Sequence, residues 1–196
     1  MARSAKISRK TNETDIKVEL DLDGSGKNSI DTGIPFFDHM LDHLSKHSMI
    51  DLNVAAKGDL EVDGHHTVED VGLSLGEALL AALGDKAGIT RYGHAAVPMN
   101  EALAEVTIDI SGRPYCVFEA SLPTGKVGEF DVELAEEFMR AIVNSAKITV
   151  HITVSRGTNL HHMVEAMFKA FARALGEAVR PDVRLKGAVP STKGSL

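Results

Sequence analysis

The sequence contains no tryptophan, only two tyrosines and a single cysteine among its 196 residues. Cys116 has no partner for an internal disulfide, and one thiol cannot form a thiolate zinc cage. No apolar run approaches the ~20 residues that a membrane helix needs, and the first ten residues lack the apolar core of a signal peptide. These absences predict a soluble, cytoplasmic protein that does not bind a membrane.

Positive charge is also scarce, with 21 Lys and Arg against 28 Asp and Glu and a formal net charge of -7. Because binding to a phosphate backbone needs clustered Lys and Arg, no nucleic-acid partner is expected. The hydrophobic share of 43% and charged share of 25% are typical of a globular domain. Histidine is what the sequence has in excess, with nine residues, and it is the commonest metal ligand.

A weak internal repeat runs through most of the chain. Four pairs of segments match in order: 12–24 with 100–112, 36–50 with 134–148, 51–55 with 149–154, and 64–70 with 160–166. The apolar spacing makes the first and third pairs strands, the second pair helices, and the fourth pair the start of long helices. We interpret each half as strand, strand, helix, strand, helix, which predicts an α+β fold of two lobes related by a pseudo-twofold axis, with sheets packed against helices.

The predicted domain is the whole chain, 1–196. It consists of two repeats over about 5–92 and 93–182, followed by a tail, 183–196. Strands followed by helices, rather than strict alternation, argue against a Rossmann sheet.

The same motif, two adjacent histidines followed by a glutamate, heads the long helix in each half. In the first copy, His65 and Glu69 are four residues apart and share a helix face, so both can bind one ion. The adjacent His66 projects about 100° away and more naturally reaches for a second ion. The second copy, at 161–165, has the same geometry. A twofold axis would then let each motif supply ligands to both of two metal ions.

The repeat adds one further candidate ligand to each metal, because His39 aligns with Glu137. The predicted ligand sets are His65, Glu69, His162 and Glu137 for one ion, and His161, Glu165, His66 and His39 for the other. Imidazole and carboxylate ligands without sulfur, with positions left open, suit a borderline-to-hard octahedral ion. Mn²⁺ is the first choice, and Fe²⁺, Co²⁺ and Zn²⁺ are alternatives.

Three segments have the chemistry to hold a phosphate. Guanidinium groups at Arg91 and Arg113 can grip it bidentately, and the PSTKG tail adds Ser191, Thr192 and Lys193. Each signal by itself is more typical of a turn residue or a flexible tail than of a phosphate site.

Acid/base candidates stand near the motifs. Glu13 starts a predicted strand and could transfer a proton, and its repeat partner Glu101 offers the same chemistry. Spacing alone leaves both open as solvated edge charges. His47 lies further along the helix that carries His39, on a similar face, where it could approach a bound ligand.

Together these segments resemble the imidazoleglycerol-phosphate dehydratase family. The matching stretches are RKTNETDI, TGIPFFDHMLDH, DGHHTVEDVG, RYGHAAVPMNEAL, DISGRP, NLHHMVEAMFKAFARAL and PSTKG. The resemblance implies that family's fold, shared with a domain of a ribosomal protein, and dehydration of D-erythro-imidazole-glycerol phosphate to imidazole-acetol phosphate in histidine biosynthesis. It also implies a cytoplasmic enzyme with two Mn²⁺ per active site, in a homo-oligomer of about 24 subunits whose sites form between neighbouring chains.

Carried over position by position, the family's metal ligands fall on His39, His65, His66, Glu69, Glu137, His161, His162 and Glu165. Some members have histidine where this chain has Glu137, so an anion replaces a neutral imidazole. The phosphate grip falls on Arg91, Arg113, Ser191 and Lys193, and the substrate-contacting glutamate on Glu13. Asn100 departs from the aspartate of the family's PMDEAL form.

The implied reaction explains the need for metals, because no carbonyl acidifies the C–H bond that breaks. An imidazole held between two metals through both nitrogens can become imidazolate and expel hydroxide through a diazafulvene-like intermediate. Glu13 is the candidate acid/base, with His47 or a displaced metal ligand such as Glu165 as rivals. Two other functions stay open. One is an assembly protein whose subunits are held together by metal ions without catalysis, and the other is a dinuclear metallohydrolase.

Overall fold

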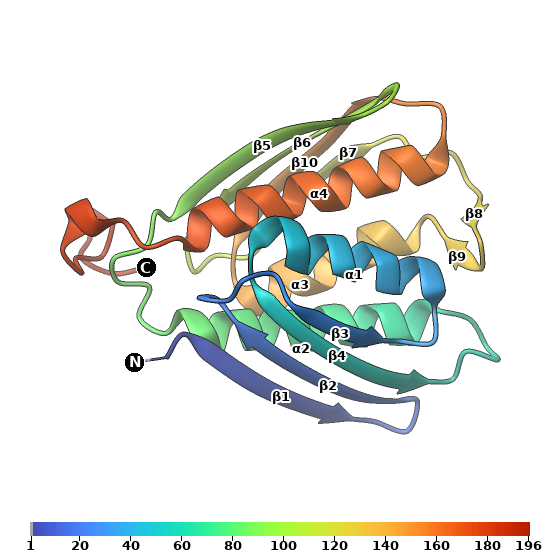
Figure 1. Ribbon diagram of the computed structural model, residues 1–196, viewed down its shortest axis with the longest axis horizontal. Coiled ribbons are helices and arrows are strands. Elements are labelled where there is room, and N and C mark those ends of the chain that lie inside the picture. The colour runs from blue at the N-terminus through green and yellow to red at the C-terminus, as the bar shows by residue number, and fades with distance from the viewer. Residues whose placement is uncertain (1) are drawn as a thin grey trace.

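Two four-stranded sheets enclose four helices in the computed structural model, which describes residues 2–196 (Figure 1). One sheet and two helices come from each half of the chain. In the described part of the chain, no helix is long and apolar enough to cross a membrane.

The first lobe forms one sheet in the order β1-β2-β4-β3, in which β3 is parallel to β4 and the other neighbours are antiparallel. Its elements are β1 (Ser4–Lys10), β2 (Thr14–Asp21), β3 (Asn28–Asp31), α1 (Pro35–Ser48), β4 (Asp51–Gly58) and α2 (His65–Leu83).

The second lobe repeats this order and these directions as β5-β6-β10-β7. Its elements are β5 (Tyr92–Met99), β6 (Ala102–Asp109), β7 (Tyr115–Ala120), α3 (Leu134–Ala146), β10 (Thr149–Arg156) and α4 (Leu160–Val179). A small hairpin of β8 (Lys126–Val127) and β9 (Phe130–Asp131) is inserted before α3, and the short 3-10 helix Val183–Leu185 follows α4. The matching topologies confirm the α+β fold of two similar lobes.

Each four-stranded sheet has one strand more than the predicted strand, strand, helix, strand, helix order provides. The additional strands, β3 and β7, are edge strands that pair in parallel with the strand following the helix. The sequence of β3, NSID, has little apolar alternation, so its strand conformation comes from this pairing rather than from its own pattern.

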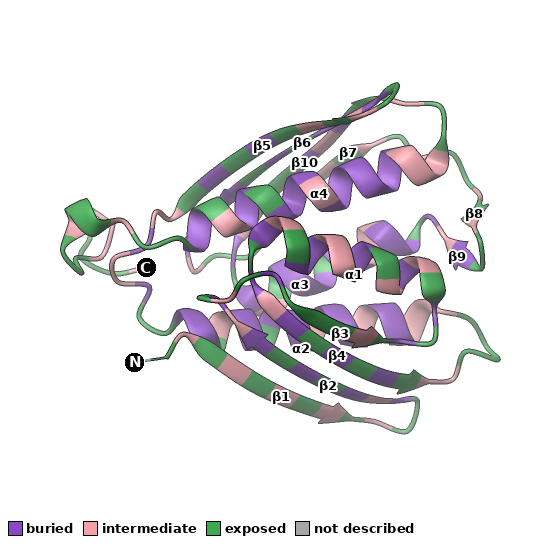
Figure 2. Cartoon of the chain, viewed as in Figure 1, coloured by how far each residue is buried: buried purple, intermediate pink, exposed green. Residues whose placement is uncertain are grey.

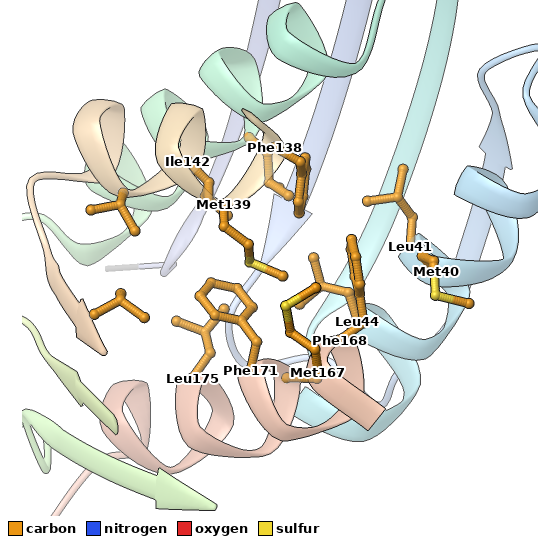
Figure 3. Close-up of a cluster of buried hydrophobic side chains, with 14 of the residues drawn as sticks. Met40, Leu41, Leu44, Phe138, Met139, Ile142, Met167, Phe168, Phe171 and Leu175 are labelled. Atoms are coloured by element: carbon orange, nitrogen blue, oxygen red, sulfur yellow. The ribbon is translucent and has the colours of Figure 1, made fainter. Parts of the chain in front are cut away.

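Period-two alternation turns one face of each sheet toward the helices (Figure 2). In β2, Ile16 and Val18 are fully buried, whereas Lys17 and Glu19 face solvent. The helices fill the space between the sheets with a shared core. Figure 3 shows it, with labelled side chains from α1 (Met40, Leu41, Leu44), α3 (Phe138, Met139, Ile142) and α4 (Met167, Phe168, Phe171, Leu175).

Two glycines let α2 pack closely against α3. A Cβ on Gly76 would lie 2.6 Å from the Cβ of Ser145, and one on Gly72 would lie 2.8 Å from the Cβ of Ala141. At the start of α2, a Cβ on Gly64 would lie 3.2 Å from a Leu134 methyl carbon. The two helices therefore run side by side from their first residues, so their first turns lie at the same level.

Candidate metal centre and substrate site

Helices α1 and α4 bring a group of imidazoles around one carboxylate. The Nε2 atom of His161 lies 2.9 Å from Glu165 Oε2, and that of His39 lies 3.5 Å from the same oxygen. His43 Nε2 lies 3.2 Å from Glu165 Oε1 and 3.2 Å from His39 Nε2. We call these four residues the α1–α4 cluster. It unites His39, His161 and Glu165, three ligands predicted for one metal.

Glu165 is the centre of this cluster, and its residue is only 4% exposed. Burial alone would raise the pKa of its carboxyl group. Hydrogen bonds from Lys169 and His161 outweigh burial and lower the pKa to about 2. Lys169 lies one helical turn after Glu165, and its Nζ donates to Glu165 Oε1 at 2.5 Å. The carboxyl group is therefore ionised at neutral pH, as a carboxylate ligand of a metal must be.

The sequence interpretation missed His43 and Lys169 as members of this site. His43 follows His39 by four residues and so shares its helix face, and Lys169 has the same relation to Glu165. That i, i+4 spacing was the available signal. Burial lowers the pKa of His43 to about 4, only partly opposed by the charge of Glu165, so its imidazole is neutral near pH 7.

His47 extends the row of imidazoles along α1. Its ring stacks on that of His43, with centroids 5.5 Å apart and planes at 24°. Burial lowers the pKa of His47, and the positive charges of Lys169 and Arg173 lower it further. The structure thus places His47 beside the cluster, as a neutral group one turn beyond it.

The equivalent residues of the other pair of helices are His65 and Glu69 on α2 and Glu137 on α3, which we call the α2–α3 set. In the repeat, Glu137 occupies on α3 the position that His39 occupies on α1. Because α2 and α3 run side by side with their first turns level, Glu69 and Glu137 lie at matching heights. Both are partly exposed.

The second histidine of each motif contacts a carboxylate outside its own motif. His66 Nδ1 lies 3.0 Å from Asp59 Oδ2 and 4.0 Å from Glu13 Oε2, whereas His162 Nδ1 lies 2.8 Å from Glu101 Oε2. A carboxylate on Nδ1 fixes the ring and leaves Nε2 as the nitrogen that can bind a metal. Within residues 2–196, the only three ligand atoms lying within 4.8 Å of one another belong to His39, His43 and Glu165, so neither His66 nor His162 joins them.

The carboxylates of the repeat partners Glu13 and Glu101 differ in exposure and in their hydrogen bonds. Glu101 lies in the β5–β6 turn, where its Oε1 accepts backbone N–H groups from Thr158 and Asn159 at 3.1 and 2.8 Å. The hydrogen bond from His162, followed by these backbone donors, lowers the pKa of Glu101 to about 2. Glu13 lies in the β1–β2 turn with its side chain 57% exposed. Glu101 is therefore held in place by three neighbours, whereas the exposed Glu13 carboxylate has no hydrogen bond within residues 2–196.

Asn100, the position that departs from the family's aspartate, occupies the same β5–β6 turn. Its φ of 50° lies in the left-handed region, which asparagine tolerates better than most residues. The asparagine thus has a local backbone role in the turn that presents Glu101.

Replacing Glu101 by glutamine is expected to weaken metal binding by roughly 10- to 100-fold, because His162 loses the anion that orients its ring. Mn²⁺ titration of the metal-free protein, followed by the electron paramagnetic resonance signal of free Mn²⁺, measures this. Glu105→Gln, on the exposed face of β6, is the matched control. Unchanged affinity in Glu101→Gln would contradict the positioning role.

The predicted phosphate residues gather at the far end of α4, around the tail. Arg91 Nε donates to Asp109 at 2.7 Å and its Nη1 donates to the carbonyl of Pro190 at 2.8 Å. Arg113 lies 4.0 Å from the same Asp109 and has its side chain 68% exposed. Arg91 therefore anchors the tail next to Arg113, which has donors to spare for a ligand.

Within the tail, the backbone N–H of Lys193 donates to Ser191 Oγ at 3.2 Å. Thr192 and Lys193 are exposed. The structure thus brings Arg91, Arg113 and the PSTKG segment to one end of the molecule, although most of Arg91's donors are already taken by protein acceptors.

The predicted metal ligands lie in the first two turns of their helices, and α1, α2 and α4 begin at the end of the molecule opposite the C-terminal tail (Figure 1). Glu165 is in the second turn of α4, and the tail leaves the helix after Val179. At 1.5 Å per residue, that segment of helix spans about 20 Å. A small phosphorylated ligand cannot bridge this distance inside a single chain.

The donor set of the α1–α4 cluster fits a divalent ion. His39, His43 and Glu165 each place one ligand atom within 4.8 Å of the others, and His161 Nε2 lies 2.9 Å from Glu165 Oε2, so imidazole nitrogens and an ionised carboxylate converge from two helices. Such nitrogen and oxygen donors, without sulfur, suit Mn²⁺ and its neighbours in the first transition row.

Comparison with known proteins places the chain in a family. The family model described as imidazoleglycerol-phosphate dehydratase matches residues 32–175. A protein of that name from Symbiobacterium thermophilum is 59% identical over 99% of this chain and 93% of its own length, and one from Ralstonia pickettii is 55% identical over the full length of both.

Solved structures agree. The imidazoleglycerol-phosphate dehydratase of Staphylococcus aureus has a TM-score of 0.83 at 44% identity and covers 91% of this chain and 99% of its own. The Pyrococcus furiosus structure has a TM-score of 0.82 at 37% identity, covering 97% and 100%. The chain therefore belongs to the imidazoleglycerol-phosphate dehydratase family, the hydro-lyases that remove water from imidazole-glycerol phosphate in histidine biosynthesis.

Proposed function

We propose that the chain carries out its family's dehydration with two Mn²⁺ per active site, in sites assembled from neighbouring subunits. The observation that carries this proposal is the separation of the α1–α4 cluster from Arg113 and the tail. The substrate has an imidazole at one end and a phosphate at the other. The metal-binding residues and the phosphate-binding residues must therefore lie no further apart than the short length of the substrate. A second chain that places its tail beside the first chain's cluster meets that need.

The orientation of His66 and His162 supports the same arrangement. Each has its Nδ1 occupied by a carboxylate of its own chain, while its Nε2 is free for a metal outside the α1–α4 cluster. A neighbouring subunit can supply the remaining ligands. The homo-oligomer of about 24 subunits and the cytoplasmic location belong to this proposal and rest on the family resemblance.

Within such a site, His39, His161 and Glu165 would hold one ion, and Glu69, His65 and Glu137 the other. Bound Mn²⁺ would supply the Lewis acidity that lets the imidazole of the substrate lose its proton. Arg113 and Lys193 would hold the phosphate, which fixes the carbon chain relative to the ring.

Glu13 is the best-placed group to take the proton from carbon. It lies beside His66, one of the proposed ligands, and its exposed, unclamped carboxylate can reach a substrate and return. His47 is the alternative, because its lowered pKa keeps it in the neutral form that accepts a proton.

The proposed activity is tested with imidazole-glycerol phosphate and protein reconstituted with Mn²⁺, following the keto phosphate and inorganic phosphate separately by NMR. We expect the keto phosphate and no released phosphate, and loss of turnover after a chelator removes the metal. Phosphate release without the keto product would support a metallohydrolase instead. Metal binding without either product would support an assembly protein.

A further inference from the structure

The two metal positions differ in their surroundings, although the repeat makes them equivalent in fold. In the α1–α4 cluster, the carboxylate of Glu165 already accepts a hydrogen bond from the Lys169 ammonium at 2.5 Å and lies 3.2 Å from His43. The repeat positions of Lys169 and His43 are Leu73 and Ala141. The α2–α3 set therefore lacks both neighbours.

The α2–α3 set also carries an additional negative charge, because Glu137 stands where the cluster has His39. Among residues 2–196, no Lys or Arg nitrogen lies within 4.0 Å of Glu69 or Glu137. Arg140, the nearest arginine along α3, pairs with Glu136 at 2.6 Å instead. One metal position thus has two carboxylates free of ion pairs, and the other has a single carboxylate that is already paired.

From this difference we infer that the α2–α3 set binds its Mn²⁺ more tightly than the α1–α4 cluster, so that the two ions load in a fixed order. This inference rests on the proposed function, since it assumes that both sets hold metal. An ion entering the cluster must displace the Lys169 ammonium from Glu165 and then remain near that positive charge. An ion entering the α2–α3 set meets two oxygen anions, the ligands that Mn²⁺ favours, and neither carboxylate is held in an ion pair within residues 2–196.

Mn²⁺ titration of the metal-free protein tests the inference without reference to turnover. Free Mn²⁺ is counted by electron paramagnetic resonance and bound metal by mass spectrometry. We expect two classes of site in equal number per chain, with Kd values that differ by roughly tenfold or more. A single class of two equal sites would overturn the inference and leave the proposed function intact, whereas no bound Mn²⁺ at all would overturn both.

Substitutions assign each class to its helices. Lys169→Met is expected to strengthen the weaker class by roughly tenfold and to leave the tighter class unchanged, because it removes the competing ammonium. Arg173→Met, which removes a cation one turn further along α4 and outside ion-pair distance of Glu165, is the matched control, expected to change either Kd by less than about twofold. Weakening of either class by Lys169→Met would overturn the inference.

Adding an ammonium group beside the α2–α3 set should weaken Mn²⁺ binding there. Leu73 is partly exposed at the repeat position of Lys169, so Leu73→Lys places an ammonium one turn after Glu69. This variant is expected to weaken the tighter class only, again by roughly tenfold. Should it fail to fold, Glu137→His removes one anion from the same set and is expected to weaken the same class. Weakening of the looser class by both variants would show that the assignment is inverted.

Discussion

Replacing Glu165 by glutamine is expected to lower turnover by at least about 10³-fold at substoichiometric Mn²⁺. The amide keeps the shape of the side chain but removes the negative charge that His39, His43, His161 and Lys169 surround. Without that charge, the cluster presents imidazoles and an ammonium to an incoming cation. Steady-state kinetics together with the metal content of the purified variant measure the effect.

Two comparisons separate loss of a ligand from damage to the fold. Glu177→Gln changes the same residue type on the same helix, at an exposed position, and should keep activity within about twofold of the native protein. Raising Mn²⁺ in the assay should partly restore Glu165→Gln, because mass action opposes a weakened site. Full metal content in an inactive Glu165→Gln protein would show that Glu165 acts in the chemistry rather than as a ligand.

Co-expressing two variants that are each impaired is expected to restore activity if sites form between chains. Arg113→Ala should raise KM strongly while leaving metal content unchanged, because the exposed guanidinium lies at the tail end of the molecule and away from the metal ligands. Glu165→Gln damages only the other end. When the two variants are co-expressed in equal amounts, about one quarter of the sites combine an intact cluster with an intact Arg113.

The measurement is turnover at substrate concentrations below KM, for particles isolated through a different affinity tag on each variant. The control pair is Glu165→Gln with His161→Ala, which damages the same cluster on both chains and should give no recovery. If Arg113→Ala with Glu165→Gln also gave no recovery, the cluster and the phosphate residues would have to act within one chain. That outcome would contradict the shared site.

The repeat and the nature of the metal chemistry could be predicted from the sequence because both are recorded in short-range patterns. Alternation of residues such as Ile16 and Val18 specifies which face of a strand is buried, and the match between the two halves implies two lobes of one topology. The i, i+4 spacing of His161 and Glu165 likewise puts both on one helix face before any packing is known. The strand count fell short because β3 takes its conformation from pairing with β4.

Other features depend on which helices become neighbours, and local spacing does not record that. The packing of α1 against α4 joins His39 to Glu165 and adds His43, whereas the contacts of Glu101 with residues 158–162 separate its role from that of Glu13. The segment of α4 from Glu165 to Val179, about 20 Å long, then separates the cluster from the end of the helix where the tail begins. The sequence by itself determined the two lobes and the kinds of ligand, because side-chain period and residue type are local properties. Only the tertiary structure decided which ligands meet and which lie apart, because those distances are set by the close packing of helices between two sheets.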